Sequence, residues 1–170
     1  LRFAKGSAAV MCADIDAGGA KETAERIAAQ GGRAAALALD VTDENAVRDA
    51  LARCVAELGG LNVLFNNAGV GVKSFEQTLD VNLKGVYYGL RHGAELLAVR
   101  GGGAIVNTAS IAGLVGLEGT MPMEGPLEGG GIGYIASKHG VVGLTRQFAL
   151  HYARRGVRVN AVAPGYIATQ

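Results

Sequence analysis

The sequence of 170 residues contains no tryptophan, three prolines and only two cysteines. The scarcity of proline and a hydrophobic content of 49% argue against a disordered chain and predict a buried core. Cys12 and Cys54 are not spaced like metal ligands, and they fall in a predicted strand and a predicted helix. We therefore interpret both as packing residues, and this cysteine usage favours a reducing, cytoplasmic setting.

The sequence also lacks an excess of charge of either sign and a long apolar run. Lys and Arg number 16, Asp and Glu number 15, and the formal net charge is +1. This balance gives no electrostatic attraction to nucleic acid or to an anionic membrane, so we expect neither as a partner. No apolar run reaches the roughly 18 residues that span a bilayer, and the first ten residues lack the layout of a signal peptide.

Short apolar runs alternate with amphipathic stretches along the chain. The apolar runs predict strands at residues 8–13, 33–39, 61–65, 104–108 and 157–163. Helices are predicted at residues 1–5, 20–30, 43–58, about 75–99 and 133–154, with Thr42 as the cap of the third. This alternation predicts a single α/β domain, residues 1–170, built on a doubly wound parallel sheet whose strands are buried on both faces.

Polar residues follow the predicted strands at the points where the strands end. They are Asp14, Asp40, Asn67, Ser110 and the turn at Pro164. In open parallel sheets, ligands bind beyond the carboxyl ends of the strands. We therefore expect these five positions to border a ligand site.

The helix predicted at residues 133–154 carries Tyr134 and Lys138, four residues apart and therefore on one face. A phenol beside an ammonium can act as an acid and a base, because a nearby positive charge favours the phenolate. This spacing arises by chance in roughly one such chain in seven, so the pair alone does not identify a site. The buried stripe of the same helix is predicted to be Val141, Leu144, Thr145, Phe148 and Tyr152.

Several short motifs follow one another in a fixed order along the chain. They are Asn66-Asn67-Ala68-Gly69, Val81-Asn82, Ser110, Tyr134-x-x-x-Lys138 and the turn from Pro164 to Thr169. Their order resembles the short-chain dehydrogenase/reductase family, over almost the whole chain. The resemblance implies a Rossmann-like fold and an oxidoreductase that transfers a hydride between NAD(H) and a secondary alcohol or ketone.

The resemblance also implies roles for four catalytic residues. Tyr134 matches the general acid and base, and Lys138 matches the residue that supports the phenolate and holds the nicotinamide ribose. Ser110 matches the hydroxyl that hydrogen-bonds the substrate oxygen, and Asn82 matches the residue that positions a water molecule in a proton relay. Taken alone, Ser110 could cap a turn, and Asn82 could be a solvated helix residue.

The resemblance implies a nicotinamide cofactor, and Asp14 indicates that it is NAD. An acidic residue at the end of the second strand of a dinucleotide fold binds the adenosine ribose and repels a 2′-phosphate, so Asp14 favours NAD over NADP, with Asp16 as a weaker alternative. The other implied cofactor contacts are Asp40, Val41, Asn67, Ala68, Gly69, Thr108, Tyr134, Lys138, Pro164, Gly165, Ile167 and Thr169. We expect no metal site, because His92, His139 and His151 have neither an acidic partner nor metal-ligand spacing.

The resemblance further implies a homodimer or homotetramer. We expect association through the helices predicted at residues 75–99 and 133–154, because small residues permit close approach of helices. These residues are Gly85, Gly89, Gly93, Gly140 and Gly143. Packing of the same glycines against the chain's own sheet is the simpler alternative.

The chain departs from the family pattern at both ends. A Gly-rich phosphate turn is expected about 20 residues before the ribose aspartate, whereas 13 residues precede Asp14 and none of them forms that turn. We therefore expect this chain to lack the family's first strand with its Gly-rich loop and the C-terminal segment, and we expect little activity from these residues alone. The Gly-rich connection at residues 113–133 is longer than in the family and could border the substrate.

Two interpretations from different classes remain open. The first is an NAD-dependent oxidoreductase. The second is a truncated, catalytically incompetent relative that acts as a binding or oligomerisation module. A Rossmann-like methyltransferase explains less, because it gives no reason for Tyr134, Lys138 and Ser110 to occur together.

Overall fold

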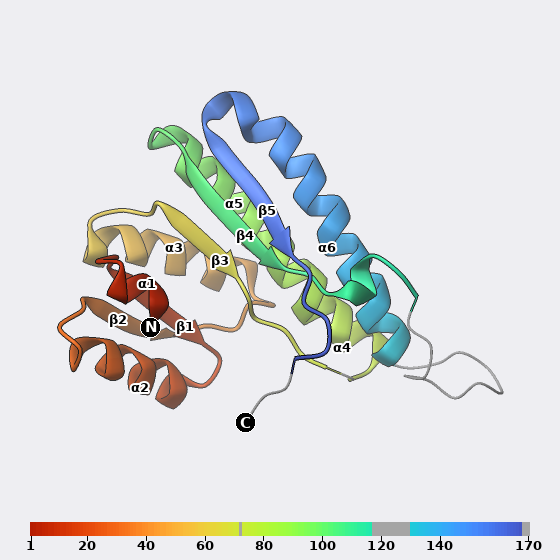
Figure 1. Cartoon of the computed structure of the whole chain (residues 1–170), viewed down its shortest axis with the longest axis horizontal. Coiled ribbons are helices and arrows are strands. Elements are labelled where there is room, and N and C mark those ends of the chain that lie inside the picture. The colour runs from red at the N-terminus through yellow and green to blue at the C-terminus, as the bar shows by residue number, and fades with distance from the viewer. Residues whose placement is uncertain (72, 117–129, 168–170) are drawn as a thin grey trace. The chain divides into compact units, whose positions relative to one another are not determined.

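The computed structural model describes residues 1–71, 73–116 and 130–167 (Figure 1). The chain divides into two compact units, Leu1–Leu61 and Asn62–Gln170, which we call the N-terminal unit and the C-terminal unit. Each unit is built from parallel strands connected by helices, as the alternation of the sequence predicts. The expectation of a single domain stays a prediction. Among the described residues, no helix is both long and apolar enough to cross a bilayer.

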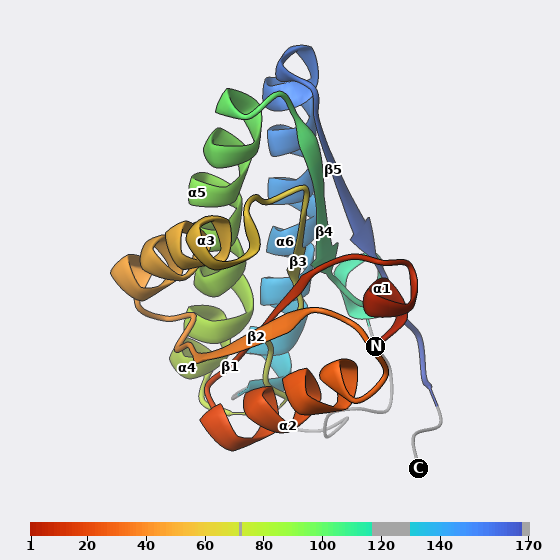
Figure 2. The same ribbon diagram turned by 90° about the vertical axis from the view of Figure 1, so that its left-hand side faces the viewer.

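The N-terminal unit is a two-stranded parallel sheet with helices on both sides. Its elements are α1 (Arg2–Lys5), β1 (Val10–Asp14), α2 (Ala17–Ala28), β2 (Ala34–Ala38) and α3 (Glu44–Leu58). Strands β1 and β2 pair along their whole length, and α2 and α3 lie on opposite sides of the pair (Figure 2). The buried side chains of Ile27, Leu37 and Leu51 come from α2, β2 and α3 and form the core of this unit.

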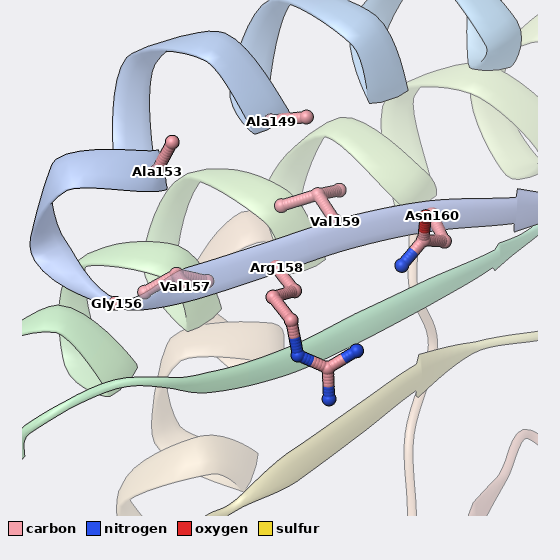
Figure 3. A pocket seen from close by; sticks show the side chains of 7 residues that line it. All are labelled: Ala149, Ala153, Gly156, Val157, Arg158, Val159 and Asn160. Carbon is pink, nitrogen blue, oxygen red and sulfur yellow. The ribbon is translucent and has the colours of Figure 1, made fainter.

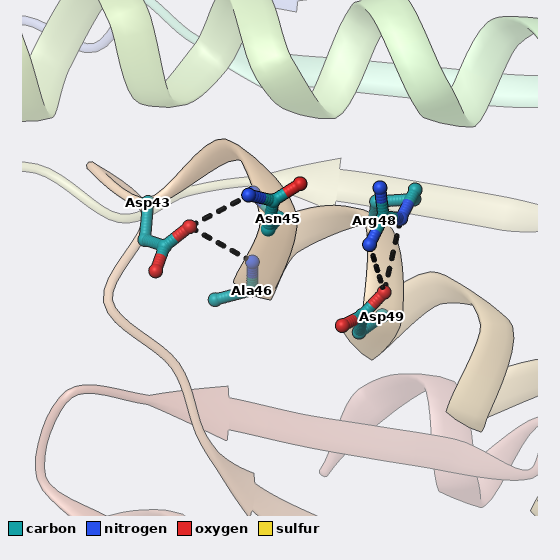
Figure 4. Close-up of polar contacts among 5 residues, drawn as sticks. All are labelled: Asp43, Asn45, Ala46, Arg48 and Asp49. Atoms are coloured by element: carbon teal, nitrogen blue, oxygen red, sulfur yellow. Dashed lines mark hydrogen bonds and ion pairs between the residues drawn. The ribbon is translucent and has the colours of Figure 1, made fainter.

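A carboxylate caps α3, and it is not the cap that the sequence predicted. Asp43 accepts hydrogen bonds from the backbone N–H groups of Asn45 and Ala46, at 2.8 and 3.1 Å (Figure 4). The prediction of Thr42 as the cap is wrong, because the N–H and the hydroxyl of Thr42 both donate to Asp40, at 2.9 and 2.8 Å. After β2 the backbone turns, so that Thr42 binds Asp40. Asp43 is then the residue that accepts hydrogen bonds from the first N–H groups of α3.

The C-terminal unit is a three-stranded parallel sheet with the order β3-β4-β5. Its elements are β3 (Val63–Asn66), α4 (Phe75–Leu79), the π-helical turn η1 (Asp80–Lys84), α5 (Gly85–Val99), β4 (Gly103–Thr108), the 3-10 turn η2 (Ile111–Gly113), α6 (Gly130–Tyr152), the 3-10 turn η3 (Ala153–Arg155) and β5 (Val157–Val162). Helices α5 and α6 cover one face of the sheet (Figure 2). Buried Leu90, Ile105 and Val141 pack between these helices and the strands.

Burial in two strands of this unit differs from the sequence prediction. Val63 and Phe65 of β3 are exposed, by 46% and 45%, and Arg158 and Asn160 of β5 are exposed as well. Because side chains alternate along a strand, these residues all point to the face that α5 and α6 do not cover. In the described residues, β3 and β5 are therefore buried on one face only, whereas the sequence predicted burial on both.

The helix predicted at residues 75–99 is continuous, but it contains the π-helical turn η1 in its first half. Such turns are rare and occur frequently at functional sites. Buried Asn82 lies in this turn. One extra residue in a helical turn shifts the apolar stripe by only part of a turn, so the sequence periodicity gave no sign of it.

Helix α6 agrees with the predicted helix over most of its length. It starts at Gly130 rather than at residue 133, and a 3-10 turn follows Tyr152. In the predicted stripe, Val141 and Thr145 are buried, whereas Leu144, Phe148 and Tyr152 are half-buried.

Candidate active site

The carboxyl ends of β3 and β4 bring together polar side chains that are 41 positions apart in the chain. Asn66 and Asn107 are neighbours in the register of the two strands, and Asn66 Nδ2 donates to Asn107 Oδ1 at 2.8 Å. One residue further along, Thr108 Oγ1 donates to Asn67 Oδ1 at 2.9 Å. Two of the predicted cofactor contacts, Asn67 and Thr108, therefore lie together where ligands of parallel sheets bind.

Helix α6 adds Lys138 and Tyr134 to this group. Lys138 is only 5% exposed, and its Nζ donates to the backbone carbonyl of Thr108 at 2.7 Å. Burial lowers the pKa of the Lys138 ammonium below its ordinary value, because desolvation disfavours the charged form. Lys138 Nζ also lies 5.5 Å from the centre of the Tyr134 ring. The structure thus brings together the phenol and the ammonium that the sequence singled out.

The segment after β4 holds Ser110 between the strands and α6. Ser110 Oγ accepts a hydrogen bond from Ala112 N–H at 3.2 Å and caps η2, so the simple reading of this serine as a turn cap is correct. The hydroxyl keeps its own proton, which it can donate to a further acceptor. Gly113 packs directly on α6: a Cβ at this position would lie 2.5 Å from the Lys138 carbonyl oxygen. Only glycine therefore lets η2 approach α6 so closely.

Asn82 pairs with the loop that follows β3. Its Oδ1 accepts from Val70 N–H at 2.7 Å, and its Nδ2 donates to the Val70 carbonyl at 2.9 Å. Asn82 is fully buried, so the reading of this residue as a solvated helix position is wrong. These two bonds fix the loop that contains the predicted contacts Ala68 and Gly69.

In the N-terminal unit, Asp14 is the last residue of β1 and has an exposed carboxylate. Its Oδ1 accepts from Asp16 N–H at 3.0 Å, and its backbone carbonyl accepts from Leu39 N–H at 2.8 Å. Asp16, the alternative ribose contact, caps α2 by accepting from Gly18 N–H at 2.9 Å, which starts this helix at Ala17 rather than at residue 20. Because Asp16 caps α2, Asp14 is the one of these two aspartates whose carboxylate remains available to a ligand.

Asp40 and Val41 follow β2 in the same unit. The backbone N–H and the hydroxyl of Thr42 hold the pKa of the Asp40 carboxyl below its ordinary value. Because β1 and β2 are parallel and paired to their ends, Asp40 lies at the same end of this sheet as Asp14.

The predicted nicotinamide turn lies only partly in the described residues. Pro164 accepts a hydrogen bond from Ile111 N–H at 3.0 Å through its carbonyl, which ties the turn to η2. Gly165 lies beside the Ile111 side chain, and Ile167 is exposed. Thr169 lies outside the described residues, as does most of the long connection at 113–133.

The three histidines differ in exposure. His139 and His151 are exposed and His92 is half-buried. His139 follows Lys138 in α6, and its Nδ1 lies 3.1 Å from the carbonyl oxygen of Ile135. Within the described ranges, no three His, Cys, Asp or Glu side chains gather closely enough to hold a metal ion.

Sequence reasoning missed a buried polar chain behind the site. Asn107 Nδ2 donates to Thr145 Oγ1 at 2.9 Å, and Asn107 also accepts the bond from Asn66. Thr145 was predicted only as part of the apolar stripe of its helix, and Asn107 was not singled out. The one available signal was an asparagine inside the apolar run AIVNT of β4.

A hollow of about 660 Å³ lies away from these residues (Figure 3). It is lined by the start of β5, including Arg158 and Asn160, and by Ala149 and Ala153 near the end of α6. No predicted site residue lines it. The chemistry of the strand ends, rather than this hollow, therefore marks the candidate active site.

The C-terminal sheet has amide and hydroxyl side chains at its strand ends, and the N-terminal sheet has an acidic side chain at the end of β1. Polar residues at the carboxyl ends of parallel strands are typical of dinucleotide-binding proteins. The chain matches the family model described as short chain dehydrogenase over residues 1–170. It belongs to that family and has its Rossmann-like α/β fold.

Relatives of known name agree with this family. The chain is 37% identical to the cyclohexanol dehydrogenase of Acinetobacter sp. (strain SE19), over 99% of this chain and 67% of that protein. It is 38% identical to the cis-4-hydroxycyclohexanecarboxylate dehydrogenase of Sinomonas cyclohexanicum, over 98% and 66%. The crystal structure of an NAD+-bound xylitol dehydrogenase superposes with a TM-score of 0.89 at 28% identity, over 100% of this chain and 65% of that one. The chain spans 67% of the length of the cyclohexanol dehydrogenase and 48% of the length of the levodione reductase of Leifsonia aquatica.

Proposed function

We propose that this chain forms the cofactor-binding and catalytic part of an NAD-dependent oxidoreductase that interconverts a secondary alcohol and a ketone. The observation that carries the proposal is the buried Lys138, whose ammonium is held on the Thr108 carbonyl at 2.7 Å and lies 5.5 Å from the centre of the Tyr134 ring. The names of two relatives, a cyclohexanol dehydrogenase and a hydroxycyclohexanecarboxylate dehydrogenase, support a ring-borne secondary alcohol as the substrate class.

In this proposal, the residues of the chain move the proton and hold the substrate. Tyr134 takes the alcohol proton during oxidation and returns it during reduction, and the Lys138 ammonium favours the phenolate form. Ser110 donates its hydroxyl proton to the substrate oxygen, where charge develops. Asn82 supports the loop after β3 and positions a water molecule for the proton relay. The nicotinamide, when bound, supplies or accepts the hydride.

The residues present fit such a cofactor. An ammonium has three donors, and the bond to Thr108 uses one of them, which agrees with a role of Lys138 toward the ribose hydroxyls. In the N-terminal unit, the exposed Asp14 carboxylate offers acceptors for ribose hydroxyls, and its charge opposes a 2′-phosphate. We therefore propose NAD over NADP as the preferred cofactor.

The Tyr134→Phe variant of the full-length protein tests the proposal. Turnover of cyclohexanol with NAD should fall by about 10²–10⁴, because the phenol is the proton carrier, whereas NAD affinity measured by calorimetry should stay within a few-fold. Tyr88→Phe, at a half-buried tyrosine of α5, is the matched control and should keep its activity. Turnover of the Tyr134→Phe variant within a few-fold of wild type would show that Tyr134 is not the catalytic acid and base. If the wild-type protein neither binds NAD nor oxidises secondary alcohols, the binding-module interpretation is the better one.

We further propose that the complete protein is a homodimer or homotetramer that associates through α5 and α6. An apolar hollow of about 340 Å³ lies between these helices and is lined by Leu83, Tyr87 and Leu144, among others. Two of the five glycines for which we expected this role pack against the chain's own sheet, which was the simpler alternative. A Cβ on Gly89 or Gly93 would collide with the Asn66 or the Leu64 side chain of β3. These two glycines therefore serve packing within the chain.

A further inference from the structure

A chain of hydrogen bonds crosses the interior of the C-terminal unit from β3 through β4 to α6. Asn66 Nδ2 donates to Asn107 Oδ1 at 2.8 Å, and Asn107 Nδ2 donates to Thr145 Oγ1 at 2.9 Å. The Thr145 hydroxyl in turn donates to the Val141 carbonyl at 2.7 Å. Asn107 is fully buried and Thr145 is 7% exposed. Burying such groups is unfavourable unless they are paired, so the geometry of this series of hydrogen bonds is strongly constrained.

Helix α6 is attached to β4 by polar bonds at two successive strand residues. The Asn107 side chain binds Thr145, and the Thr108 carbonyl binds the Lys138 ammonium. Lys138 and Thr145 are seven residues apart, which is about two helical turns and places them on one face. Apolar packing is not directional, so it does not by itself fix how far a helix lies along a strand. Two directional bonds on adjacent strand residues do fix that position.

We propose that Asn107 and Thr145 are positioning residues: their hydrogen bond fixes the axial position of α6 on β4 and thereby holds the Lys138 ammonium at the Thr108 carbonyl. This inference rests on the proposed function, in which Lys138 supports the Tyr134 phenolate. Loss of the Asn107–Thr145 bond leaves the Lys138–Thr108 bond as the remaining polar attachment of α6 to β4 that is described here. The ammonium then leaves the carbonyl more often and meets water.

Gly89 of α5 makes room for Asn66, the first residue of this hydrogen-bonded series. A Cβ at this position would collide with Asn66 Oδ1, so any larger residue would push the amide that donates to Asn107. A Cβ on Gly93, one turn further along α5, would instead collide with the tip of the Leu64 side chain. On the same helix, Gly89 thus adjoins a polar residue of β3, and Gly93 adjoins an apolar residue of β3.

The test compares Thr145→Val with Thr145→Ser in the full-length protein. Valine keeps the shape but removes the hydroxyl, whereas serine retains it. Thr78→Val is the matched control, because Thr78 of α4 is fully buried and its hydroxyl also donates to the carbonyl four residues earlier, that of Ser74, at 2.8 Å. The readout is the rate of reductive methylation of Lys138 by mass spectrometry, relative to Lys21, whose side chain is 74% exposed. All variants are measured below their unfolding transitions.

We expect Thr145→Val to raise the relative labelling rate of Lys138 by about five-fold, the effect of losing one hydrogen bond. Thr145→Ser and Thr78→Val should label like wild type. Likewise, Gly89→Ala should raise the rate more than Gly93→Ala. A wild-type rate in Thr145→Val, or an equal rise in Thr78→Val, overturns the inference, because the bond then contributes only to stability.

Turnover of a secondary alcohol with NAD is measured on the same preparations. A kcat that falls in Thr145→Val and recovers in Thr145→Ser supports both the inference and the proposed function. A labelling response in a protein that binds no NAD and turns over no alcohol supports the positioning role and overturns the function. The labelling readout therefore separates the failure of one from the failure of the other.

Discussion

The exposed aspartates of the N-terminal unit and the buried polar side chains of the C-terminal unit bind partners at very different distances along the chain. In the N-terminal unit, Asp14, Asp40 and Asp43 bind backbone groups two or three residues away, and all three are exposed. In the C-terminal unit, the bonds of Asn107 and Lys138 reach partners 30 to 41 residues away, and both side chains are buried.

This difference separates two kinds of site residue. The position of an exposed aspartate in a local turn depends on little beyond its own loop, so its substitution should not disturb the core. A buried amide or ammonium paired over a long range depends on the position of several elements, and its loss leaves a partner unsatisfied. We therefore expect substitutions in the C-terminal unit to affect chemistry and stability more than substitutions in the N-terminal unit.

The largest expected contrast is in turnover. Lys138→Met should lower kcat in the full-length protein by about 10²–10³, because it removes a buried charge that favours the phenolate. Lys21→Met, in α2 of the N-terminal unit, should leave kcat within about two-fold, because Lys21 makes only an exposed pair with Glu25 among the contacts described here. Steady-state kinetics with NAD and a secondary alcohol provide the measurement. Equal effects of the two substitutions would break the comparison.

The next contrast is in stability. Asn82→Ala removes two hydrogen bonds to the Val70 backbone from a fully buried position, and should cost about 2–4 kcal/mol. Asp43→Ala removes the exposed cap of α3 and should cost about 1 kcal/mol. Urea denaturation of the full-length variants measures both. A loss for Asp43→Ala as large as that for Asn82→Ala would show that local caps matter as much as buried bonds.

The same division decides how much of the molecule could be predicted from sequence. Asp14 at the end of β1 and the Tyr134–Lys138 pair on one helix depend on local patterns, and the structure places them as expected. The predicted cap of α3 was wrong by one residue. Thr42 and Asp43 are both residue types that cap helices well, and Thr42 is instead bound to Asp40. Local rules thus identify the element but not always the residue.

The buried polar chain could not have been predicted by the same means. Asn66, Asn107 and Thr145 lie 41 and 38 residues apart, and only the packing of β3, β4 and α6 brings them together. In sequence, Thr145 has the spacing of an apolar position, and its hydroxyl becomes informative only once Asn107 faces it. The π-helical turn at Asn82 has the same character, because its amide pairs with a loop residue 12 positions away.

The smallest expected contrast is in the pH dependence of stability. Burial lowers the pKa of Lys138, so the folded protein releases this proton at a lower pH than the unfolded chain does. Between the two pKa values the unfolded chain binds more protons, and the free energy of unfolding therefore rises with pH as it approaches 10.5, the ordinary lysine value. Lys138→Met should lack this rise.

For Lys84, in the same unit, the effect of pH on stability has the opposite sign. Its hydrogen bond to Asp80 raises the pKa of Lys84 above the ordinary value, so any stability that it contributes is present below that value and is lost as the pH rises through the folded pKa. This pair is exposed, so its contribution is small and screened by salt. Urea denaturation from pH 8 upward, at low and high salt, should therefore show the stability of Lys138→Met falling relative to wild type with rising pH, independently of salt. Lys84→Met should show a weaker, salt-sensitive change of the opposite sign. If both variants followed the wild-type curve, the burial of Lys138 would carry no energetic weight, and the contrast between buried and exposed charges would not hold.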